Sequence, residues 1–344
     1  MKKTTVLVTG GTGYLASWIV KDLLEEGHDV RITVRDKGKE EKYEHLLQIE
    51  KETPGNLYIY EADLLKNGSF DLAVEGTEFV FHTASPFYLS GIKDAYYELV
   101  KPAKEGTRNV LLSVNKADSV KRVILTSSVA AVHGDNRDMN GKQEFTEKDW
   151  NESSSVEHQP YNYSKTVAEK EAWSIQKEQN NWDLVTINPG FILGPSLAKR
   201  TDSTSISTIL DLLKGTYKTG VPKLFFGMVD VRDTAKAHIL AAFKENASGR
   251  YIISGKEATI FDMAKILEKK FPDQYALPKR EVPKPLMWLI APTLGFTRKY
   301  VSTNVGHSLK LNNSKSIKDL GMNYRSLEAT LIDQKNQLDE AGLI

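Results

Sequence analysis

Three tyrosines in the sequence are each followed by a lysine four residues later: Tyr97, Tyr161 and Tyr275. In a helix this spacing places both side chains on one face. A phenol can donate a proton to an oxygen that gains negative charge during a reaction. A lysine cation one turn away favours the phenolate and lowers the pKa of the phenol from its ordinary value of about 10. A helical pair of this kind therefore predicts a proton donor.

The pair that begins at Tyr161 has the sequence context of a long helix. Pro160 can occupy the first position of a helix, and the residues after it continue a helical pattern for several turns. The pair at Tyr275 contains Pro278, which argues against the helical register. The pair at Tyr97 ends against Pro102 and lies before the fifth expected strand, on what we expect to be a packing helix. We therefore predict that Tyr161 is the proton donor and that Lys165 lowers its pKa.

Two serines, Ser127 and Ser128, follow the apolar run 122–126. If that run is a parallel strand, both serines lie at the carboxyl edge of a sheet, where doubly wound sheets hold their ligands. A serine hydroxyl there can orient a carbonyl oxygen toward the phenol of Tyr161. We predict this role for Ser128, with its neighbour as the alternative. Together these side chains fit carbonyl reduction, because the alkoxide that hydride transfer leaves behind needs a proton.

A glycine-rich turn follows the first strand-like run, in the segment TGGTGYLAS. Gly10 and Gly13 permit a tight turn and let backbone N–H groups approach a pyrophosphate, while Ala16 allows close packing of helix against strand. The spacing departs from the strict fingerprint of such loops. Its place between a strand and a helix nevertheless favours dinucleotide binding over a plain turn. We include the first helical residues, Tyr14 and Leu15, in this predicted site.

The second strand-like run, 29–34, is followed by Arg35, where enzymes that select NAD more often carry an acid. The guanidinium can bind a 2′-phosphate through two hydrogen bonds, and Lys42 lies a few residues further on. NADP(H) is therefore favoured over NAD(H). Against this, Asp36 could serve a ribose hydroxyl, and both basic residues could belong to a solvated loop. After the third run, Asp63 is a candidate to accept from the adenine amino group or to cap a helix.

Apolar runs alternate with amphipathic segments over the first 190 residues, and this alternation supplies the scaffold for these candidates. It predicts an α/β fold with a doubly wound parallel sheet covered by helices on both faces. The expected strands are 4–9, 29–34, 57–60, 79–82, 122–126 and 184–188. The expected helices between them include 16–26 and 107–115.

After residue 190 the rhythm becomes irregular, and we expect a smaller region that faces the substrate. Residues 1–190 are predicted to form the nucleotide-binding Rossmann domain, with returning segments at about 228–255. Residues 191–344 are predicted to be mainly substrate-binding. Two helices and one short strand are expected in the later part: 229–243, 261–270 and 250–253. The two regions are therefore expected to interleave.

The composition excludes several other classes of protein. The 344 residues carry a formal net charge of +1 and no cysteine. We therefore expect no nucleic-acid partner, no disulfide and no zinc–thiolate site, and the histidines lack the spacing of other metal ligands. The N-terminus lacks the apolar core of a signal peptide, and the longest apolar run, 286–296, is too short to span a bilayer. A cytoplasmic protein with no membrane partner is expected, with this run as core or pocket lining and a surface membrane contact as the alternative.

Taken together, segments such as TGGTGYLAS, LTSSVAAV, YNYSKTVAE and NPGFILGP resemble those of the extended short-chain dehydrogenase/reductases. The resemblance is closest to the branch of dihydroflavonol reductases, cinnamoyl-CoA reductases and microbial aldehyde and ketone reductases, and it covers almost the whole chain. It implies a Rossmann cofactor domain, a smaller C-terminal substrate domain and NADPH-dependent reduction of a small carbonyl compound. It also implies that Ser128, Tyr161 and Lys165 are the catalytic residues.

The same resemblance implies a set of cofactor contacts. Arg35 and Lys42 fall on the family's 2′-phosphate positions, and Asp63 falls on its adenine site. The full set of predicted cofactor-binding residues is Gly10, Gly13, Tyr14, Leu15, Arg35, Lys42, Asp63, Leu64, Thr83, Ala84, Pro189, Gly190 and Ser205.

Two positions depart from the family pattern. Ala103 stands where many extended members have an asparagine, so that backbone or water would have to replace a fourth side chain in the proton relay. His133 stands where plant dihydroflavonol reductases carry an asparagine that meets the substrate, which argues against a flavonoid. His133 remains a candidate for lining the pocket, the alternative being a solvated turn. Other candidates, for which ordinary core packing is the alternative, are Phe87, Tyr88, Phe191 and 224–228.

The leading hypothesis is an NADPH-dependent reductase that converts an aldehyde or ketone to an alcohol. The alternatives on the same scaffold are a hydroxysteroid-type dehydrogenase and a nucleotide-sugar epimerase. A non-catalytic NADP-sensing regulator is a different class. Arg35 argues against the epimerases, which usually hold NAD, and the pair of Tyr161 and Lys165 argues against the sensor. We expect a monomer or a homodimer.

Overall fold

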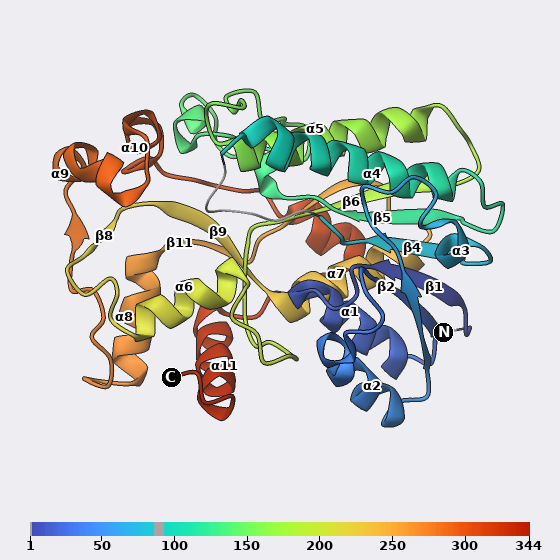
Figure 1. Cartoon of the computed structure of the whole chain (residues 1–344). Coiled ribbons are helices and arrows are strands. Elements are labelled where there is room, and N and C mark those ends of the chain that lie inside the picture. Colours follow the sequence, from blue (N-terminus) through green and yellow to red (C-terminus); the bar gives the residue numbers. More distant parts are fainter. Residues whose placement is uncertain (1, 86–92) are drawn as a thin grey trace.

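A computed structural model describes residues 2–85 and 93–344, and its largest element is a parallel β-sheet (Figure 1). Seven of the described strands form this sheet in the order β10-β6-β5-β4-β1-β2-β3, and all the pairings are parallel. The strands are β1 (Thr5–Thr9), β2 (Asp29–Val34), β3 (Asn56–Glu61), β4 (Phe79–His82), β5 (Arg122–Thr126), β6 (Asp183–Pro189) and β10 (Gly249–Ile253). The predicted doubly wound α/β fold is confirmed, and each predicted strand overlaps an observed one.

The order of the strands reverses at β1. The chain runs outward from β1 through β2 to β3 and then returns to place β4 on the other side of β1. In sheets of this kind ligands bind outside the carboxyl ends of the strands at the point of reversal. The residues that directly follow β1 and β4 are Gly10 and Thr83, and both belong to the predicted cofactor site.

Helices cover both faces of the sheet because successive residues of a strand point to opposite sides. Val6 and Val8 of β1 join one apolar cluster with α1 and α7, whereas Leu7 joins another with α4 and α5. Figure 1 shows α4 and α5 above the sheet and α1, α2 and α7 below it. These helices, with the short α3, are α1 (Tyr14–Glu25), α2 (Glu44–Lys51), α3 (Asp71–Val74), α4 (Lys101–Val114), α5 (Pro160–Lys177) and α7 (Val231–Phe243).

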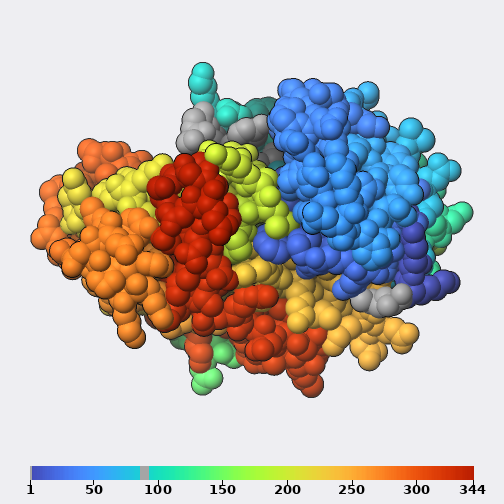
Figure 2. Space-filling model, turned by 90° about the horizontal axis from the view of Figure 1, so that it is seen from below, coloured from blue at the N-terminus to red at the C-terminus, as the bar shows by residue number. Residues whose placement is uncertain are grey.

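A second region follows β6 and is built on short strands and helices around its own apolar cluster. Its small sheets contain β7 (Phe191–Leu193), β9 (Phe225–Asp230) and β11 (Lys256–Thr259), and separately β8 (Val221–Pro222) and β12 (Glu281–Val282). Its helices are α6 (Thr204–Leu213), α8 (Ile260–Lys270), α9 (Lys284–Ile290), α10 (Arg298–Asn304) and α11 (Leu327–Glu340). Figure 2 shows α11 in red beside α8 in orange. The strands of this region were not predicted, because four of them have only two to four residues and carry too little periodicity; β9, with six residues, was missed as well.

The chain crosses back to the large sheet after β9. The predicted helix 229–243 is observed as α7, which begins after Asp230 because the carboxylate of this residue caps the helix by accepting from the Arg232 N–H. α7 packs against α1, and β10 then adds an edge strand beside β6. A segment from the second half of the chain therefore completes the sheet begun by the first half.

The apolar run 286–296 differs from the buried lining that was predicted. Met287 and Ala291 are buried in a small cluster, whereas the side chains of Leu286 and Trp288 are exposed. The short helix α9 packs mainly against α10, so that only one of its faces is covered. Among the described residues no helix is long and apolar enough to cross a membrane.

Candidate active site

The glycine turn between β1 and α1 has the geometry of a phosphate cradle. Gly10 adopts φ 64°, a left-handed conformation that favours glycine, and its carbonyl accepts from the Gly13 N–H at 2.9 Å. A Cβ on Gly10 would lie 3.1 Å from the Cβ of Ala84, so the turn sits tightly against the end of β4. Gly13 has no side chain to cap α1, and no acid lies in the first turn of that helix. The first N–H groups of α1, from Tyr14 and Leu15 onward, therefore suit an anionic group.

The ends of β1 and β4 are joined by hydrogen bonds through Thr9. The hydroxyl of Thr83 donates to the Thr9 carbonyl at 2.6 Å, and the N–H of Ala84 donates to the Thr9 hydroxyl at 3.1 Å. His82 contacts the same hydroxyl through Nδ1 at 2.9 Å, and burial lowers the pKa of this histidine to about 3. Thr83 and Ala84 thus stand beside the glycine turn at the point where the strand order reverses.

Arg35 and Lys42 lie near the end of β2, and both are exposed. The carboxylate of Asp36 is used within its own loop: it accepts from the Gly38 N–H at 2.9 Å and pairs with Lys39 at 3.7 Å. This local use weakens the alternative in which Asp36 serves a ribose hydroxyl. Arg35 forms no ion pair with a carboxylate of the described residues, and its exposed guanidinium is accessible to an anionic group.

Sequence reasoning missed Arg200, which lies in the segment between β7 and α6 and reaches across to the glycine turn. Its guanidinium donates to the Thr12 carbonyl at 3.0 Å and to the carboxylate of Asp202 at 2.7 and 3.0 Å. Burial, and after it the charge of Arg200, lowers the pKa of His45, which contacts the Ser17 hydroxyl of α1, to about 4. No spacing rule could have identified a single arginine in an irregular segment that is distant in the sequence.

Asp63 follows β3 and is exposed. Its carboxylate accepts from the Leu65 N–H at 2.8 Å, which forms a local turn, and α3 begins only at Asp71. The alternative that Asp63 caps a helix is therefore wrong. The carbonyl of Leu64 accepts from the Asn109 side chain at 2.8 Å, which fixes this segment against α4.

The structure separates the three tyrosine–lysine pairs. Tyr161 and Lys165 both lie in α5, with the ammonium nitrogen 5.8 Å from the centre of the phenol ring. Tyr97 lies on a short π-helical turn before α4 and is 64% exposed. Tyr275 lies outside any helix. The ammonium nitrogen of Lys101 lies 5.7 Å from the centre of the Tyr97 ring, so Pro102 does not separate that pair. What distinguishes the pair of Tyr161 and Lys165 is its lower exposure and its place in a long helix beside the sheet.

Burial determines the protonation of the Tyr161 pair. It raises the pKa of Tyr161 to about 12 and lowers the pKa of Lys165 to about 8. The direction for Tyr161 is opposite to the one predicted, because loss of water around a phenolate outweighs attraction by the lysine. Tyr161 is therefore a neutral phenol near pH 7, which is the form that can donate a proton, and Lys165 can exchange its own proton near that pH.

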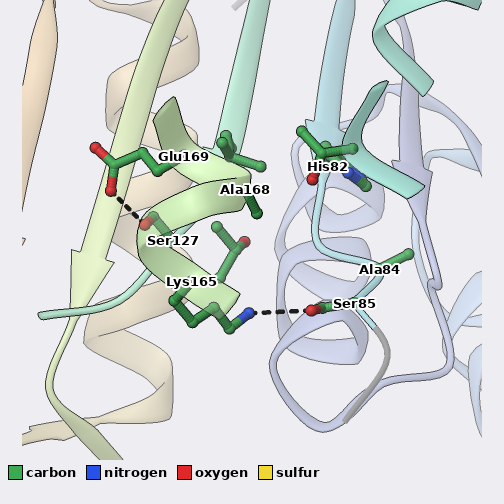
Figure 3. A pocket seen from close by; sticks show the side chains of 10 residues that line it. His82, Ala84, Ser85, Ser127, Lys165, Ala168 and Glu169 are labelled. Carbon is green, nitrogen blue, oxygen red and sulfur yellow. Dashed lines mark hydrogen bonds between the residues drawn. The ribbon is translucent and has the colours of Figure 1, made fainter. Parts of the chain in front are cut away.

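The two serines after β5 point to different partners. The hydroxyl of Ser127 donates to the buried carboxylate of Glu169, as Figure 3 shows. The hydroxyl of Ser128 accepts from the Ala130 N–H at 3.1 Å and caps the turn that packs against α5. Since Ser127 is held by Glu169, Ser128 is the better candidate to meet a substrate.

A small cavity lies beside Lys165 (Figure 3), whose ammonium donates to the Ser85 hydroxyl at 3.1 Å. Thr107 reaches this cavity from α4, one turn after the buried Ala103 that replaces the family's asparagine. The residues that line the cavity are His82, Ala84, Ser85, Thr107, Leu125, Thr126, Ser127, Lys165, Ala168 and Glu169. Four of these residues carry hydroxyl groups: Ser85, Thr107, Thr126 and Ser127.

Pro189 and Gly190 lie where β6 ends and the second region begins. The Gly190 N–H donates to the Ile253 carbonyl at 3.0 Å. A Cβ on Gly190 would lie 2.2 Å from the carbonyl oxygen of Gly227 in β9, so that only glycine permits this approach. Ser205 lies in the first turn of α6 and is 8% exposed.

The candidate pocket residues have different surroundings. His133 is buried, stacks on Phe145 with ring centres 5.0 Å apart and has a pKa lowered by burial to about 4. It is therefore not the solvated turn residue of the alternative. Phe191 packs against Phe226 with ring centres 5.8 Å apart. Within 224–228, Leu224 and Met228 are buried, and Phe87 and Tyr88 lie outside the described residues.

Similar proteins of known activity are reductases. The chain is 42% identical over 277 residues to cinnamoyl-CoA reductase CAD2 of Medicago truncatula, covering 78% of this chain and 81% of that protein. It is 38% identical over 347 residues to tetraketide alpha-pyrone reductase 1 of Arabidopsis thaliana, covering 99% of this chain and 97% of that protein. These relatives belong to the reductase branch that the motifs resemble.

Solved structures show the same architecture. The yeast methylglyoxal/isovaleraldehyde reductase Gre2 in complex with NADPH matches with a TM-score of 0.82 and 32% identity, over 99% of this chain and 100% of that one. Vestitone reductase from alfalfa, Medicago sativa, matches with a TM-score of 0.75 and 31% identity, over 99% and 100%. The family model that describes the 3-beta hydroxysteroid dehydrogenase/isomerase family matches residues 7–264. The chain therefore belongs to that family of extended short-chain dehydrogenase/reductases, as its motifs predicted.

Proposed function

We propose that this protein is an NADPH-dependent reductase that converts an aldehyde or a ketone to an alcohol. The observation that carries the proposal is the pair of Tyr161 and Lys165 in α5, beside the carboxyl edge of the sheet that also holds the glycine cradle. A neutral phenol, a lysine that exchanges protons near neutrality and a serine hydroxyl are the groups that carbonyl reduction needs.

In this proposal the residues around the glycine turn hold the nucleotide. The backbone from Gly10 and Gly13 to Tyr14 and Leu15 binds the pyrophosphate at the start of α1. Arg35 and Lys42 bind the 2′-phosphate, for which a guanidinium is well suited. The residues assigned to the adenine and nicotinamide portions are Asp63, Leu64, Thr83, Ala84, Pro189, Gly190 and Ser205.

The proposed reaction divides its tasks among Ser128, Tyr161 and Lys165. Bound NADPH supplies the hydride that reduces the carbonyl carbon. The hydroxyl of Ser128 donates a hydrogen bond to the carbonyl oxygen and orients it. Tyr161 donates its phenolic proton to the same oxygen as negative charge develops there. Lys165 holds the nicotinamide ribose and returns a proton to the phenolate through its ammonium group, and the hydroxyl-lined cavity beside it offers a path for that proton.

The relatives favour this class over the alternatives. Two relatives, 42% and 38% identical to this chain, are a cinnamoyl-CoA reductase and a tetraketide alpha-pyrone reductase by name. The family description favours a hydroxysteroid dehydrogenase as the second candidate. A protein bound to UDP-glucuronic acid and NAD is only 19% identical, so that its likeness concerns the fold alone. Arg35 also argues against an enzyme that holds NAD.

The division of labour along the chain follows from the same proposal. Residues 1–190, with the returning part at about 228–255, bind the nucleotide, and residues 191–344 mainly bind the substrate. His133 and Phe191 are candidates for contact with that substrate, as is Phe87. We propose a cytoplasmic monomer or homodimer that acts on a small molecule.

The proposal is tested by the loss of NADPH absorbance with a panel of aromatic and aliphatic aldehydes, ketones and diketones. Steroid alcohols with NADP and UDP-sugars with NAD serve as separate arms. We expect turnover with members of the carbonyl panel and little with NADH. Turnover confined to a steroid or a nucleotide sugar would replace the proposal, and a protein that binds NADP without any turnover would point to a sensor.

A further inference from the structure

A buried carboxylate lies one helical turn after Lys165. Glu169 of α5 is 1% exposed and accepts hydrogen bonds from several neighbouring elements. The Asn188 side chain of β6 donates at 2.7 Å, the Nε of Arg250 in β10 donates at 2.6 Å, and the hydroxyl of Ser127 after β5 also donates. One carboxylate thus connects the helix to three adjacent positions of the sheet.

The partner guanidinium is held as firmly as the carboxylate. Arg250 donates to the Glu147 carbonyl at 2.9 Å and to the Ala131 carbonyl at 3.2 Å. Its planar group lies 3.9 Å from the centre of the Trp150 ring. With its ion pair to Glu169, the arginine has partners on all sides and is confined to one orientation.

Two of the donors to Glu169 are next to residues assigned to the reaction. Ser127 directly precedes Ser128, and the Asn188 side chain also donates to the Ser128 carbonyl at 3.0 Å. Asn188 in turn precedes the segment assigned to the nicotinamide. Figure 3 shows Glu169 and Lys165 projecting from the same helix, each hydrogen-bonded to a residue from a different part of the sheet.

A buried ion pair of this kind is weak evidence for stability. Removing two charges from water costs free energy that their attraction often only balances. Geometry is a stronger reason to retain one at this place, since a displacement of about 1 Å can slow an enzymatic step by about a hundredfold. The network fixes α5 against the strand ends that carry the other reacting groups.

We propose that Glu169, together with Arg250, is a positioning residue for the reduction. It holds α5 in the register that brings Tyr161 and Lys165 to the carbonyl oxygen oriented by Ser128. The inference rests on the proposed reductase function. Glu169 is 1% exposed, and in this proposal it acts through Ser127, Asn188 and Arg250.

The test replaces Glu169 by glutamine in the full-length protein. Glutamine keeps the size of the side chain but removes the charge. Its NH2 group replaces one carboxylate oxygen and would face the donors of Ser127, Asn188 and Arg250. We expect the dissociation constant for NADPH, measured by its fluorescence, to change less than about threefold. The turnover per NADPH-binding site falls about 10- to 100-fold with the best substrate of the panel.

A kinetic isotope effect separates positioning from a loss of folded protein. With NADPH deuterated at the transferred position, we expect a larger isotope effect on turnover in Glu169→Gln than in the wild type. The reason is that hydride transfer becomes slower relative to product release. Partial unfolding lowers the number of sites and leaves the isotope effect unchanged. An unchanged turnover per site, or an unchanged isotope effect, would overturn the positioning role.

Two further variants complete the test. Glu171→Gln is the matched control, because Glu171 lies in the same helix but forms surface ion pairs with Lys104 and Arg108, and we expect wild-type turnover. Ser127→Ala removes one donor to Glu169 and leaves the ion pair, and we expect a three- to tenfold loss of turnover even if the glutamine variant does not fold. Wild-type turnover in Ser127→Ala would then overturn the proposal. A wild-type protein without reductase activity would instead overturn the proposed function.

Discussion

The two edges of the large sheet hold arginine–carboxylate pairs that resemble one another in chemistry and differ in place. At the amino edge, Arg122 binds Asp183 at 2.6 and 2.8 Å, each residue being the first of its strand. Toward the carboxyl edge, Arg250 binds Glu169 beside the candidate catalytic residues. The residue types alone do not distinguish the two pairs. Their position relative to the strand ends does, because ligands bind at the carboxyl edge.

The remaining partners of Arg122 explain what the amino-edge pair does. Its guanidinium donates to the carbonyl of Ala241 at 2.8 Å and to that of Lys244 at 2.7 Å, at the end of α7. The last carbonyls of a helix lack internal partners and are stabilised by a cation. Arg122 therefore attaches the returning helix to the sheet. We expect substitutions at this edge to change stability and those at the other edge to change turnover.

The largest expected effect at the carboxyl edge is that of Tyr161→Phe. Loss of the proton donor lowers turnover by about 10² to 10⁴ and leaves NADPH affinity unchanged. Steady-state kinetics and fluorescence titration measure the two quantities. Tyr97→Phe, at an exposed tyrosine that also precedes a lysine by four residues, is the control with wild-type turnover. A modest loss in Tyr161→Phe would remove that residue from its assigned role.

The next expected effect is a decline of kcat/KM for NADPH by about tenfold per pH unit on the alkaline side. Burial lowers the pKa of Lys165 to about 8, so the ammonium is lost as the pH rises through that value. kcat/KM for NADPH, which reports the free enzyme, is therefore expected to be constant below about pH 7.5 and to fall above about pH 8.5. Lys165→Arg keeps its charge throughout this range and should lack the alkaline decline. A decline that persists in the arginine variant would assign it to another group.

A tenfold to hundredfold effect is expected for Arg35→Ala at the end of β2. A charge-assisted hydrogen bond to the 2′-phosphate contributes about 1.5 to 3 kcal/mol to the free energy of NADPH binding. Its loss weakens NADPH binding and leaves NADH binding unchanged, because NADH lacks this phosphate. Titration with both nucleotides measures the ratio of affinities. Lys39→Ala, at a lysine paired with Asp36 in the same loop, is the control with an unchanged ratio. Equal weakening of both nucleotides would show that Arg35 supports the loop and does not read the phosphate.

The smallest effect on the reaction is expected for Arg122→Met at the amino edge. The variant loses its hydrogen bonds to Asp183 and to the end of α7, at a cost of about 1 to 2 kcal/mol in the free energy of unfolding, since Asp183 is half-exposed. Denaturant titration measures this loss. Turnover per NADPH-binding site stays at the wild-type value. A large loss of turnover would show that the two edges are coupled and would end the contrast between them.

The sequence predicted the elements whose signals are local. The runs that became β2, β4 and β5 matched the observed bounds, because buried strands are rich in apolar and β-branched residues. The helix that carries Tyr161 was identified from Pro160 and the helical pattern after it. The glycine turn was identified from its place between strand and helix.

Features that depend on distant contacts were not predicted. Glu169 and Arg250 meet only because β10 returns to the sheet, and no local pattern encodes that meeting. Arg200 approaches the glycine turn from the second region for the same reason. The predicted direction of the pKa shift of Tyr161 was wrong, because the burial that raises this pKa depends on all the residues packed around the ring.

The return of the chain from the second region to the first limits how the enzyme can be taken apart. β10 supplies the hydrogen bonds along one side of β6, and α7 covers α1. A fragment that stops near residue 190 would expose an unpaired strand and an apolar helix face, both of which favour aggregation. A hybrid enzyme could take its substrate-recognition half from a relative. It should then keep the native residues 231–253 together with the N-terminal half and replace only the residues from about 190 to 230 and those after 253.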